Sequence, residues 1–152
     1  MASLGEKALQ ELGVSFTSHP YDYRQKGAKP AAEALGIPLE ATFKSLVIRL
    51  HDKSFVFLLA PGGRAVSMRK FARAIGTKSA ELASERDAER LTGYRVGGIG
   101  PFGSRTSLPV YLDLEAIEQD LIYFNGGRRG LLLSMHPEQF LEAANAELIE
   151  TA

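Results

Sequence analysis

Glycine is concentrated in one short segment of this chain, residues 96–103. Each glycine in the interior of a helix or a strand costs roughly 0.5–1 kcal/mol, so the segment is predicted to be a loop. A loop with few side chains can present successive backbone N–H groups to a ligand, and such groups stabilise anions and developing oxyanions. A tight connection between two elements is the alternative. The segment contains Gly97, Gly98, Gly100 and Gly103, with a proline at Pro101.

The spacing Gly98-X-Gly100-X-X-Gly103 formally matches the dinucleotide-binding fingerprint, but its context does not. That fingerprint follows a strand and opens a helix. Here residues 90–95 are predicted to end a helix, and Pro101 and Pro109 disfavour a helix after the glycines. We therefore exclude a dinucleotide-binding site in this segment.

Hydrophobic periodicity and capping residues predict short helices and strands along the chain. The residues 55–60 are apolar on both faces, which is typical of a central strand. The pattern as a whole predicts a single α+β domain, residues 1–152, with a mixed, mainly antiparallel sheet flanked by helices. Helices are expected at residues 4–12 (capping box Ser3 and Glu6), at 30–35, from Ser67 to 75, from Ser84 to near 93, up to 119, and from Pro137 onward. Strands are expected at 14–18, 43–50, 54–60, 110–113, 121–124, 129–133 and 148–149.

Composition excludes several classes of chemistry. The chain has no cysteine and three scattered histidines, so neither a thiol nucleophile nor a recognisable metal-ligand spacing is present, and no metal or cofactor is expected. No apolar run approaches the roughly 20 residues that span a bilayer. The start of the chain does not resemble a secretory signal, so we expect no membrane association and a cytoplasmic protein.

Charge is balanced overall but unevenly distributed. Eighteen basic and eighteen acidic residues give a formal net charge of zero, which argues against a general polyanion binder. Residues 64–80 nevertheless contain five cations and no acid. This stretch is either a solvated helix face or a local patch that contacts phosphate.

Lys44 stands at the start of an expected strand and shares its parity with Leu46 and Ile48. Because strand side chains alternate between faces, Lys44 begins an apolar face. Its amine either reaches water at the sheet margin or lies at the mouth of a pocket, where it could hold a phosphate or a ribose. A second polar segment, Asn125 to Gly130, begins with Asn-Gly, which is a strong signal for a hairpin turn.

Taken together and in order, several motifs resemble the YbaK/EbsC proteins, which are free-standing relatives of the editing domain inserted in bacterial prolyl-tRNA synthetases. The resemblance extends from about Glu6 to the last helix. It rests on Tyr21, Phe43-Lys44-Ser45-Leu46, Gly93-Tyr94, Val96-Gly97-Gly98-Ile99-Gly100-Pro101, Leu108-Pro109 and Gly126-Gly127-Arg128-Arg129-Gly130.

The resemblance implies a mixed-sheet fold and trans-editing without a metal, in which a wrong amino acid, typically cysteine or alanine, is removed from tRNA(Pro). The expected ligand is the acceptor end of an aminoacyl-tRNA, and prolyl-tRNA synthetase is a candidate partner that delivers it. By this resemblance Lys44 and Gly97 are catalytic candidates, and the loop amides add Gly98 and Gly100. The substrate-binding candidates are Tyr21, Ser45, Pro101, Asn125, Gly126 and Gly127.

Two departures leave the amino acid open. Cysteine-specific members tend to carry an acid shortly after Gly-Gly-X-Arg-Gly, whereas residues 131–133 are three leucines. The segment after Tyr21 is also shorter, and an aromatic residue of those members has no assigned counterpart. Cysteine is the first expectation, alanine or another mischarged tRNA the alternative, and a non-catalytic module that binds an aminoacyl-nucleotide or tRNA the second class. The nucleophile is expected to be water or a group of the substrate itself.

Overall fold

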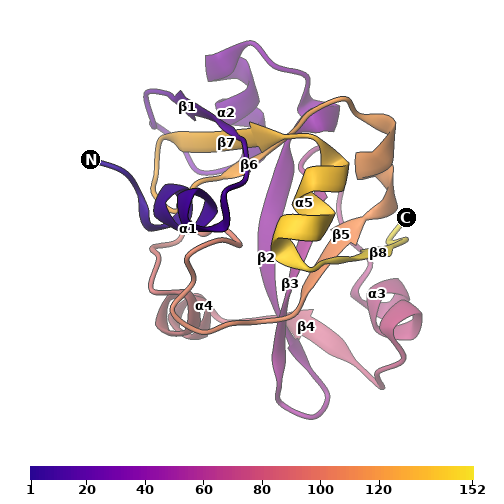
Figure 1. The fold of residues 1–152 in the computed structure, drawn as a ribbon. Helices are drawn as coiled ribbons and strands as arrows, with labels where there is room; N and C mark the ends of the chain where they lie inside the picture. Colours follow the sequence, from indigo (N-terminus) through magenta and orange to yellow (C-terminus); the bar gives the residue numbers. More distant parts are fainter.

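The fold begins with a helix that is followed by a short strand (Figure 1). The computed structural model describes all residues from 1 to 152. Its α-helices are α1 (Leu4–Leu12), α2 (Ala28–Leu35), α3 (Met68–Ile75), α4 (Glu85–Thr92) and α5 (Pro137–Ala144), with 3₁₀ turns η1 (Leu39–Ala41) and η2 (Leu114–Glu118). Its strands are β1 (Thr17–Pro20), β2 (Phe43–Leu50), β3 (Phe55–Pro61), β4 (Ala80–Leu82), β5 (Val110–Asp113), β6 (Ile122–Asn125), β7 (Leu131–Met135) and β8 (Glu147–Ile149).

The predicted helix starts are confirmed by their caps. The Ser3 side chain accepts the Glu6 N–H while the Glu6 carboxylate accepts the Ser3 N–H, which is the expected capping box of α1. Ser67 and Ser84 cap α3 and α4 in the same way through their hydroxyls. Each of these three helices ends on a glycine in the left-handed conformation.

The strands form two sheets, one with the order β4–β2–β3–β5–β8 and one with the order β1–β7–β6. Four strand pairs are antiparallel, and only β3–β5 and β5–β8 are parallel, which confirms a mixed, mainly antiparallel α+β fold. A single parallel bridge between Thr42 and Tyr123 joins the two sheets. The sequence had predicted one sheet, because this long-range bridge leaves no local pattern.

Several element boundaries differ from the sequence-based prediction. The first strand lies at Thr17–Pro20 instead of 14–18, because its limits are set by pairing with β7. Helix α2 begins two residues before Pro30, since the first turn of a helix does not need the missing N–H of proline. The turn after β6 extends to Gly130, which moves β7 to Leu131–Met135. Strand β4 was not anticipated, because it has only three residues and all of them are half or fully exposed.

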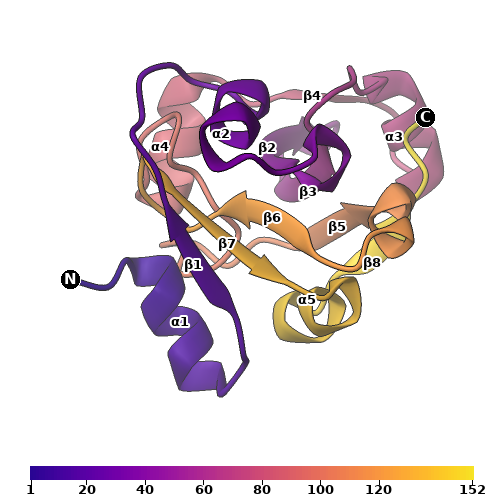
Figure 2. The ribbon, with the colours of Figure 1, turned by 90° about the horizontal axis from the view of Figure 1, so that it is seen from above.

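The main core lies between the β2–β3 pair and the inner face of the β1–β7–β6 sheet. Helices α1 and α5 cover one side of that sheet and α2 lies on the other (Figure 2). A second apolar cluster, centred on Leu58 and Phe71, fills the opposite face of β3 beneath α3. Strand β3 is thus buried on both faces, as expected for a central strand. None of the helices has the length and apolar character required to cross a membrane.

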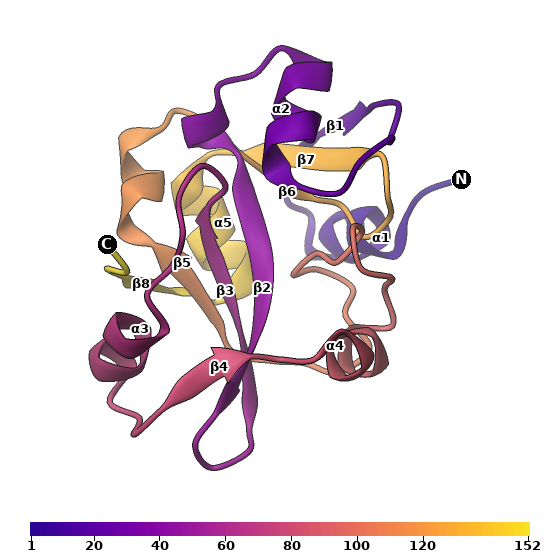
Figure 3. The same ribbon diagram turned by 180° about the vertical axis from the view of Figure 1, so that it is seen from behind.

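Helix α3 and helix α4 lie on opposite sides of the β2–β3 pair (Figure 3). Strand β4 pairs with the second half of β2, at Ile48, Arg49 and Leu50. The first half of β2 is therefore free on that edge. The cavity described next opens at this half of the strand.

Candidate functional site

A cavity of about 410 Å³ lies where the start of β2, helix α2, the glycine loop and the end of β6 meet. Its lining includes five of the ten residues expected at the site from the sequence. These five come from four separate parts of the chain and are Tyr21, Lys44, Ser45, Gly97 and Asn125. The other five, Gly98, Gly100, Pro101, Gly126 and Gly127, are not part of the lining.

Lys44 and Ser45 are neighbours on β2, and only the Lys44 side chain has a hydrogen-bond partner in the protein. The Lys44 Nζ donates to the backbone carbonyl of Arg64 at 2.7 Å. Burial lowers the pKa of the Lys44 ammonium below its ordinary value, and the charge of Arg64 lowers it further. The Ser45 hydroxyl is buried and has no hydrogen-bond partner in the protein, which is true of no other buried polar side-chain atom. Since an unpaired buried hydroxyl is costly, Ser45 retains hydrogen-bonding capacity for a ligand.

The Arg64 side chain binds two carboxylates and does not line the cavity. Its guanidinium donates to Asp113 at 2.9 Å and to Glu115 at 3.1 Å. The Asp113 carboxylate is buried and also accepts the Thr151 hydroxyl. This network fixes the segment whose carbonyl receives the Lys44 amine, so the lysine points along the cavity wall instead of freely into solvent.

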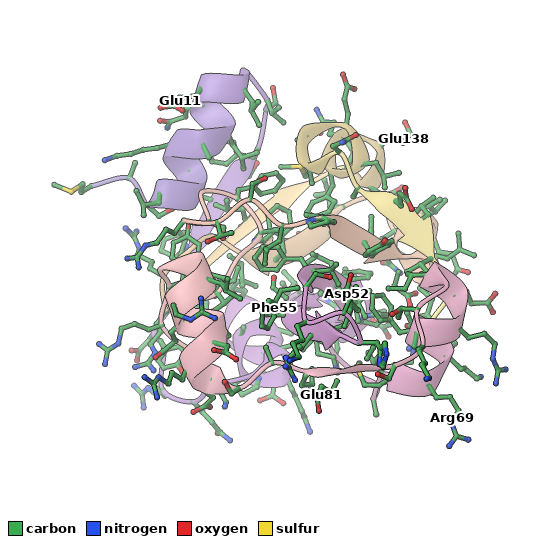
Figure 4. All side chains as sticks on the ribbon, turned by 90° about the horizontal axis from the view of Figure 1, so that it is seen from below. Glu11, Asp52, Phe55, Arg69, Glu81 and Glu138 are labelled. Carbon is green, nitrogen blue, oxygen red and sulfur yellow. The ribbon has the colours of Figure 1, made fainter.

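The basic stretch at residues 64–80 lies away from the cavity. Arg64 is paired with carboxylates, and the Lys70 amine donates to the carbonyl of Ala152 at 2.7 Å. Arg69 extends from α3 into solvent (Figure 4). No residue of this stretch lines the cavity. The alternative interpretation, a solvated helix face, therefore describes α3 better.

Some residues of the glycine loop line the cavity, and others pack against the rest of the protein. The Gly98 N–H closes a turn by donating to the Arg95 carbonyl at 2.8 Å, so it is not free to bind a ligand. The N–H groups of Gly97, Ile99 and Gly100 donate to no protein atom. Of these three residues, Gly97 and Ile99 line the cavity. The cavity wall thus includes two residues whose amides are unpaired, Gly97 and Ile99, whereas the predicted set was Gly97, Gly98 and Gly100.

Gly98 and Gly100 have a structural reason to be glycine. Both are buried, and a Cβ at Gly98 would lie 2.7 Å from the backbone nitrogen of Arg129. A Cβ at Gly100 would overlap the backbone carbonyl of Asn125. The loop therefore packs directly, backbone against backbone, on the turn that joins β6 and β7.

Asn125 connects this turn to the cavity. Its Nδ2 donates to the Gly97 carbonyl at 3.1 Å, and its Oδ1 accepts the Gly127 N–H at 2.8 Å. Gly127 has a φ of +99° and packs against the ring of Tyr94. Gly126 and Gly127 thus shape the turn, while the Asn125 side chain holds Gly97 in place.

Sequence reasoning missed several residues at the rim. The Tyr23 hydroxyl lies beside Gly97, where a Cβ would come within 2.5 Å of it, and Arg129 stacks on the Tyr23 ring with its guanidinium carbon 5.5 Å from the ring centre. Lys26 and Thr42 also line the cavity. Burial, followed by the nearby Tyr23, raises the pKa of Tyr21 above its ordinary value. Tyr21 and Tyr23 lie two residues apart in the sequence, and this spacing could have indicated that both belong to the site.

The comparisons with known proteins agree with this arrangement. Residues 24–143 match the model of the aminoacyl-tRNA editing domain. A protein of Enterococcus faecalis, provisionally named Cys-tRNA(Pro)/Cys-tRNA(Cys) deacylase EbsC, is 34% identical over 146 residues, which cover 95% of this chain and 89% of the relative. A proline–tRNA ligase of Caldicellulosiruptor bescii is 38% identical over 81 residues, which cover 53% of this chain and 14% of the ligase.

Two solved structures share the fold over nearly their whole length. One, described as a candidate trans-editing enzyme for prolyl-tRNA synthetase, has a TM-score of 0.85 and 25% identity, with 99% of this chain and 98% of that chain covered. The other, a hypothetical protein, has a TM-score of 0.90 at 21% identity, with 98% and 99% covered, and supports the fold alone. The YbaK/EbsC resemblance is confirmed, and the chain belongs to the aminoacyl-tRNA editing domain family.

Proposed function

We propose that this protein is a trans-editing deacylase that cleaves the ester of a mischarged tRNA(Pro), with Cys-tRNA(Pro) as the first candidate substrate. One observation carries the proposal. A single cavity is lined by Gly97 and Ile99, whose backbone amides are unpaired, by Ser45, whose buried hydroxyl is unpaired, and by Lys44, whose ammonium keeps two free donors. These groups are donors to an oxyanion and to the hydroxyls or phosphate of a ribose.

In the proposed reaction, water adds to the ester carbonyl carbon and the carbonyl oxygen becomes an oxyanion. The amides of Gly97 and Ile99 would donate to that oxyanion, and the loss of one such donor typically costs about 10²–10³ in rate. When the intermediate collapses, the bond from the carbonyl carbon to the ribose oxygen breaks, and the ribose oxygen takes up a proton. The free amino acid and the tRNA hydroxyl are the products.

No Asp, Glu or His side chain lines the cavity, so the proposal assigns no protein base to the attacking group. The nucleophile is water, whose released proton goes to the ribose oxygen, or the thiol of a cysteinyl substrate. In the second case the sulfur bonds to the carbonyl carbon, the bond to the ribose oxygen breaks, the thiol proton goes to that oxygen, and the amino acid leaves as a cyclic thiolactone. Lys44 uses one of its three N–H donors on the Arg64 carbonyl, so two remain for the terminal ribose or its phosphate.

The cavity wall favours a small, uncharged amino acid. Phe43, Ile99 and Leu132 present apolar surface, and no carboxylate is available to pair with a charged side chain. This supports cysteine or alanine and leaves the choice between them to a substrate panel. Because the net charge is zero, we further propose that prolyl-tRNA synthetase delivers the tRNA in the cytoplasm.

The test is deacylation of Cys-, Ala- and Ser-tRNA(Pro), with and without prolyl-tRNA synthetase. Lys44→Ala and Ser45→Ala are expected to lower kcat/KM about 10- to 100-fold, the usual range for a lost charge-assisted or buried hydrogen bond. Lys78→Ala, an exposed lysine on the connection after α3, is the matched control and is expected to behave as wild type. Gly97→Ala is a poor probe, because Gly97 has a φ of +94° and the added methyl would strike Tyr23.

Undiminished activity in both Lys44→Ala and Ser45→Ala would refute the assignment of the site. If the wild type cleaves none of the three substrates, with or without the synthetase, but is thermally stabilised by an aminoacyl-adenosine analogue, the protein is a binding module and not an enzyme.

A further inference from the structure

Arg129 occupies a fixed position at the rim of the cavity. Its Nε donates to the Val96 carbonyl at 2.9 Å, and its guanidinium lies over the ring of Tyr23. Val96 itself lines the cavity, and a Cβ at the neighbouring Gly97 would lie 3.2 Å from the Arg129 Nε. The guanidinium is thus oriented by one hydrogen bond and one stacking contact immediately beside the proposed oxyanion donors.

The rest of the Arg129 head group is available. Its two terminal nitrogens donate to no protein atom, and the residue is exposed. Arg95 is also exposed and forms no ion pair, while Lys26 lines the opposite part of the cavity. The acid beside Val96 is Glu89, whose Oε2 accepts the Val96 N–H at 2.8 Å, and it forms no ion pair with Arg129. The rim therefore presents an oriented, unpaired guanidinium fork.

We propose that Arg129 binds a phosphodiester of the tRNA 3′ end, the one that precedes the acylated ribose. The inference rests on the proposed function, in which the ester carbonyl lies against Gly97 and Ile99. The ribose that bears this ester is then at the cavity mouth, and its 5′ phosphate lies outside, on the rim. A planar guanidinium matches the oxygens of a phosphate with two parallel N–H donors, which a lysine cannot do.

The alternative phosphate surface, α3, is less suitable. Arg64 is paired with two carboxylates, Lys70 is bonded to Ala152, and α3 lies across the β2–β3 pair from α4 and the glycine loop (Figure 3). Arg73 on this helix carries the same charge as Arg129, is exposed and makes no ion pair. It is therefore a matched control for a charge that does not border the cavity.

The experiment uses an RNA minihelix that ends in CCA and carries no amino acid. Its binding is measured by fluorescence anisotropy from 50 to 200 mM salt. Arg129→Gln is expected to weaken binding about 3- to 10-fold. It should also reduce the slope of log K against log salt by about 0.7, the value for one phosphate of a single strand. Arg73→Gln is expected to change neither quantity. Arg129→Lys, which keeps the charge without the fork, should keep the slope and lose at least twofold in affinity.

Three results would each overturn the inference. The first is an Arg129→Gln protein with wild-type affinity and slope, and the second is an equal loss of affinity in Arg129→Gln and Arg73→Gln. The third is no binding by the wild type at 50 mM salt. If Arg129→Gln does not fold, as judged by its thermal transition, the decision falls to Arg129→Lys, and unchanged affinity in that variant overturns it. The RNA carries no amino acid, so the result is independent of whether the protein deacylates any substrate.

Discussion

At the scale of single residues, Asn125 is the side chain that joins the turn to the glycine loop. It uses its amide nitrogen on the Gly97 carbonyl and its amide oxygen on the Gly127 N–H. Both bonds are partly buried, so neither is readily replaced by water. The Asn125 side chain thus fixes the Gly97–Gly98 peptide unit, while Arg129 holds the Val96 carbonyl, which shares its peptide unit with the Gly97 N–H.

Asn125→Asp keeps the shape of the residue but removes the donor to the Gly97 carbonyl. Two acceptor oxygens then face each other, and we expect kcat/KM for Cys-tRNA(Pro) to fall by at least about tenfold, the cost of leaving one partly buried acceptor unpaired. The bond to the Gly127 N–H is retained, so the thermal transition should change less than it does for Asn125→Ala. An Asn125→Asp protein with unchanged kcat/KM would show that the loop holds its position without this bond.

At the scale of elements, the glycine loop and the β6–β7 turn form one packed unit. Gly100→Ala tests this packing, because Gly100 does not have a positive φ and the added methyl would meet the backbone of Asn125 and Gly127 in the turn. We expect a loss of roughly 1–3 kcal/mol or more in the free energy of unfolding, measured by urea denaturation, as for other overpacked sites.

Gly36→Ala is the control for backbone conformation alone. Gly36 ends α2 with a φ of +66°, and no atom lies within 4 Å of the added methyl. Its cost should be about 1–2 kcal/mol, from the left-handed conformation only. If Gly100→Ala proves cheaper than Gly36→Ala, the backbone of the turn yields and the two segments are not a rigid unit.

Elements with local signals could be predicted well, and those defined by distant partners could not. The β2–β3 hairpin follows from two apolar runs around a polar turn, and α1, α3 and α4 follow from serine caps and terminal glycines. Strand β4 and the division into two sheets depend on pairing with β2 and on the Thr42–Tyr123 bridge. No local periodicity encodes such contacts.

The site shows the same division. Lys44, Ser45, Gly97, Asn125 and Tyr21 could be expected from motifs and do line the cavity. The roles of Gly98 and Gly100 could not be separated from that of Gly97 by sequence, because only the structure shows which face of the loop meets the turn. Arg129 was expected to begin a strand after the turn, and its contact with Tyr23 joins segments more than one hundred residues apart.

At the scale of the whole molecule, stability should decline on mild acidification. His19 on β1 contacts the buried Ser134 hydroxyl at 2.8 Å, and burial lowers its pKa below 6.5. The unfolded chain therefore binds more protons than the folded chain just below pH 6.5, and stability is lost as the pH falls through the folded pKa. Glu6 acts in the same direction, but only below 4.5, because hydrogen bonds from Ser18 and Ser3 lower its pKa.

The measurement is the thermal transition between pH 7.5 and 5 for the wild type and His19→Gln. The Tm of the wild type should fall over this interval. The Tm of His19→Gln should fall less, because glutamine does not titrate. Parallel profiles for the two proteins would assign the acid sensitivity to other groups.

The backbone-to-backbone contact between the glycine loop and the β6–β7 turn also limits how this chain can diverge. At Gly98 and Gly100 no side chain separates the two segments, so an insertion or a bulkier residue in one has to be compensated by an alteration in the other. We therefore expect related sequences to change the two segments together. For the same reason, a graft of the loop into a different scaffold would keep its shape only if the turn were transplanted with it.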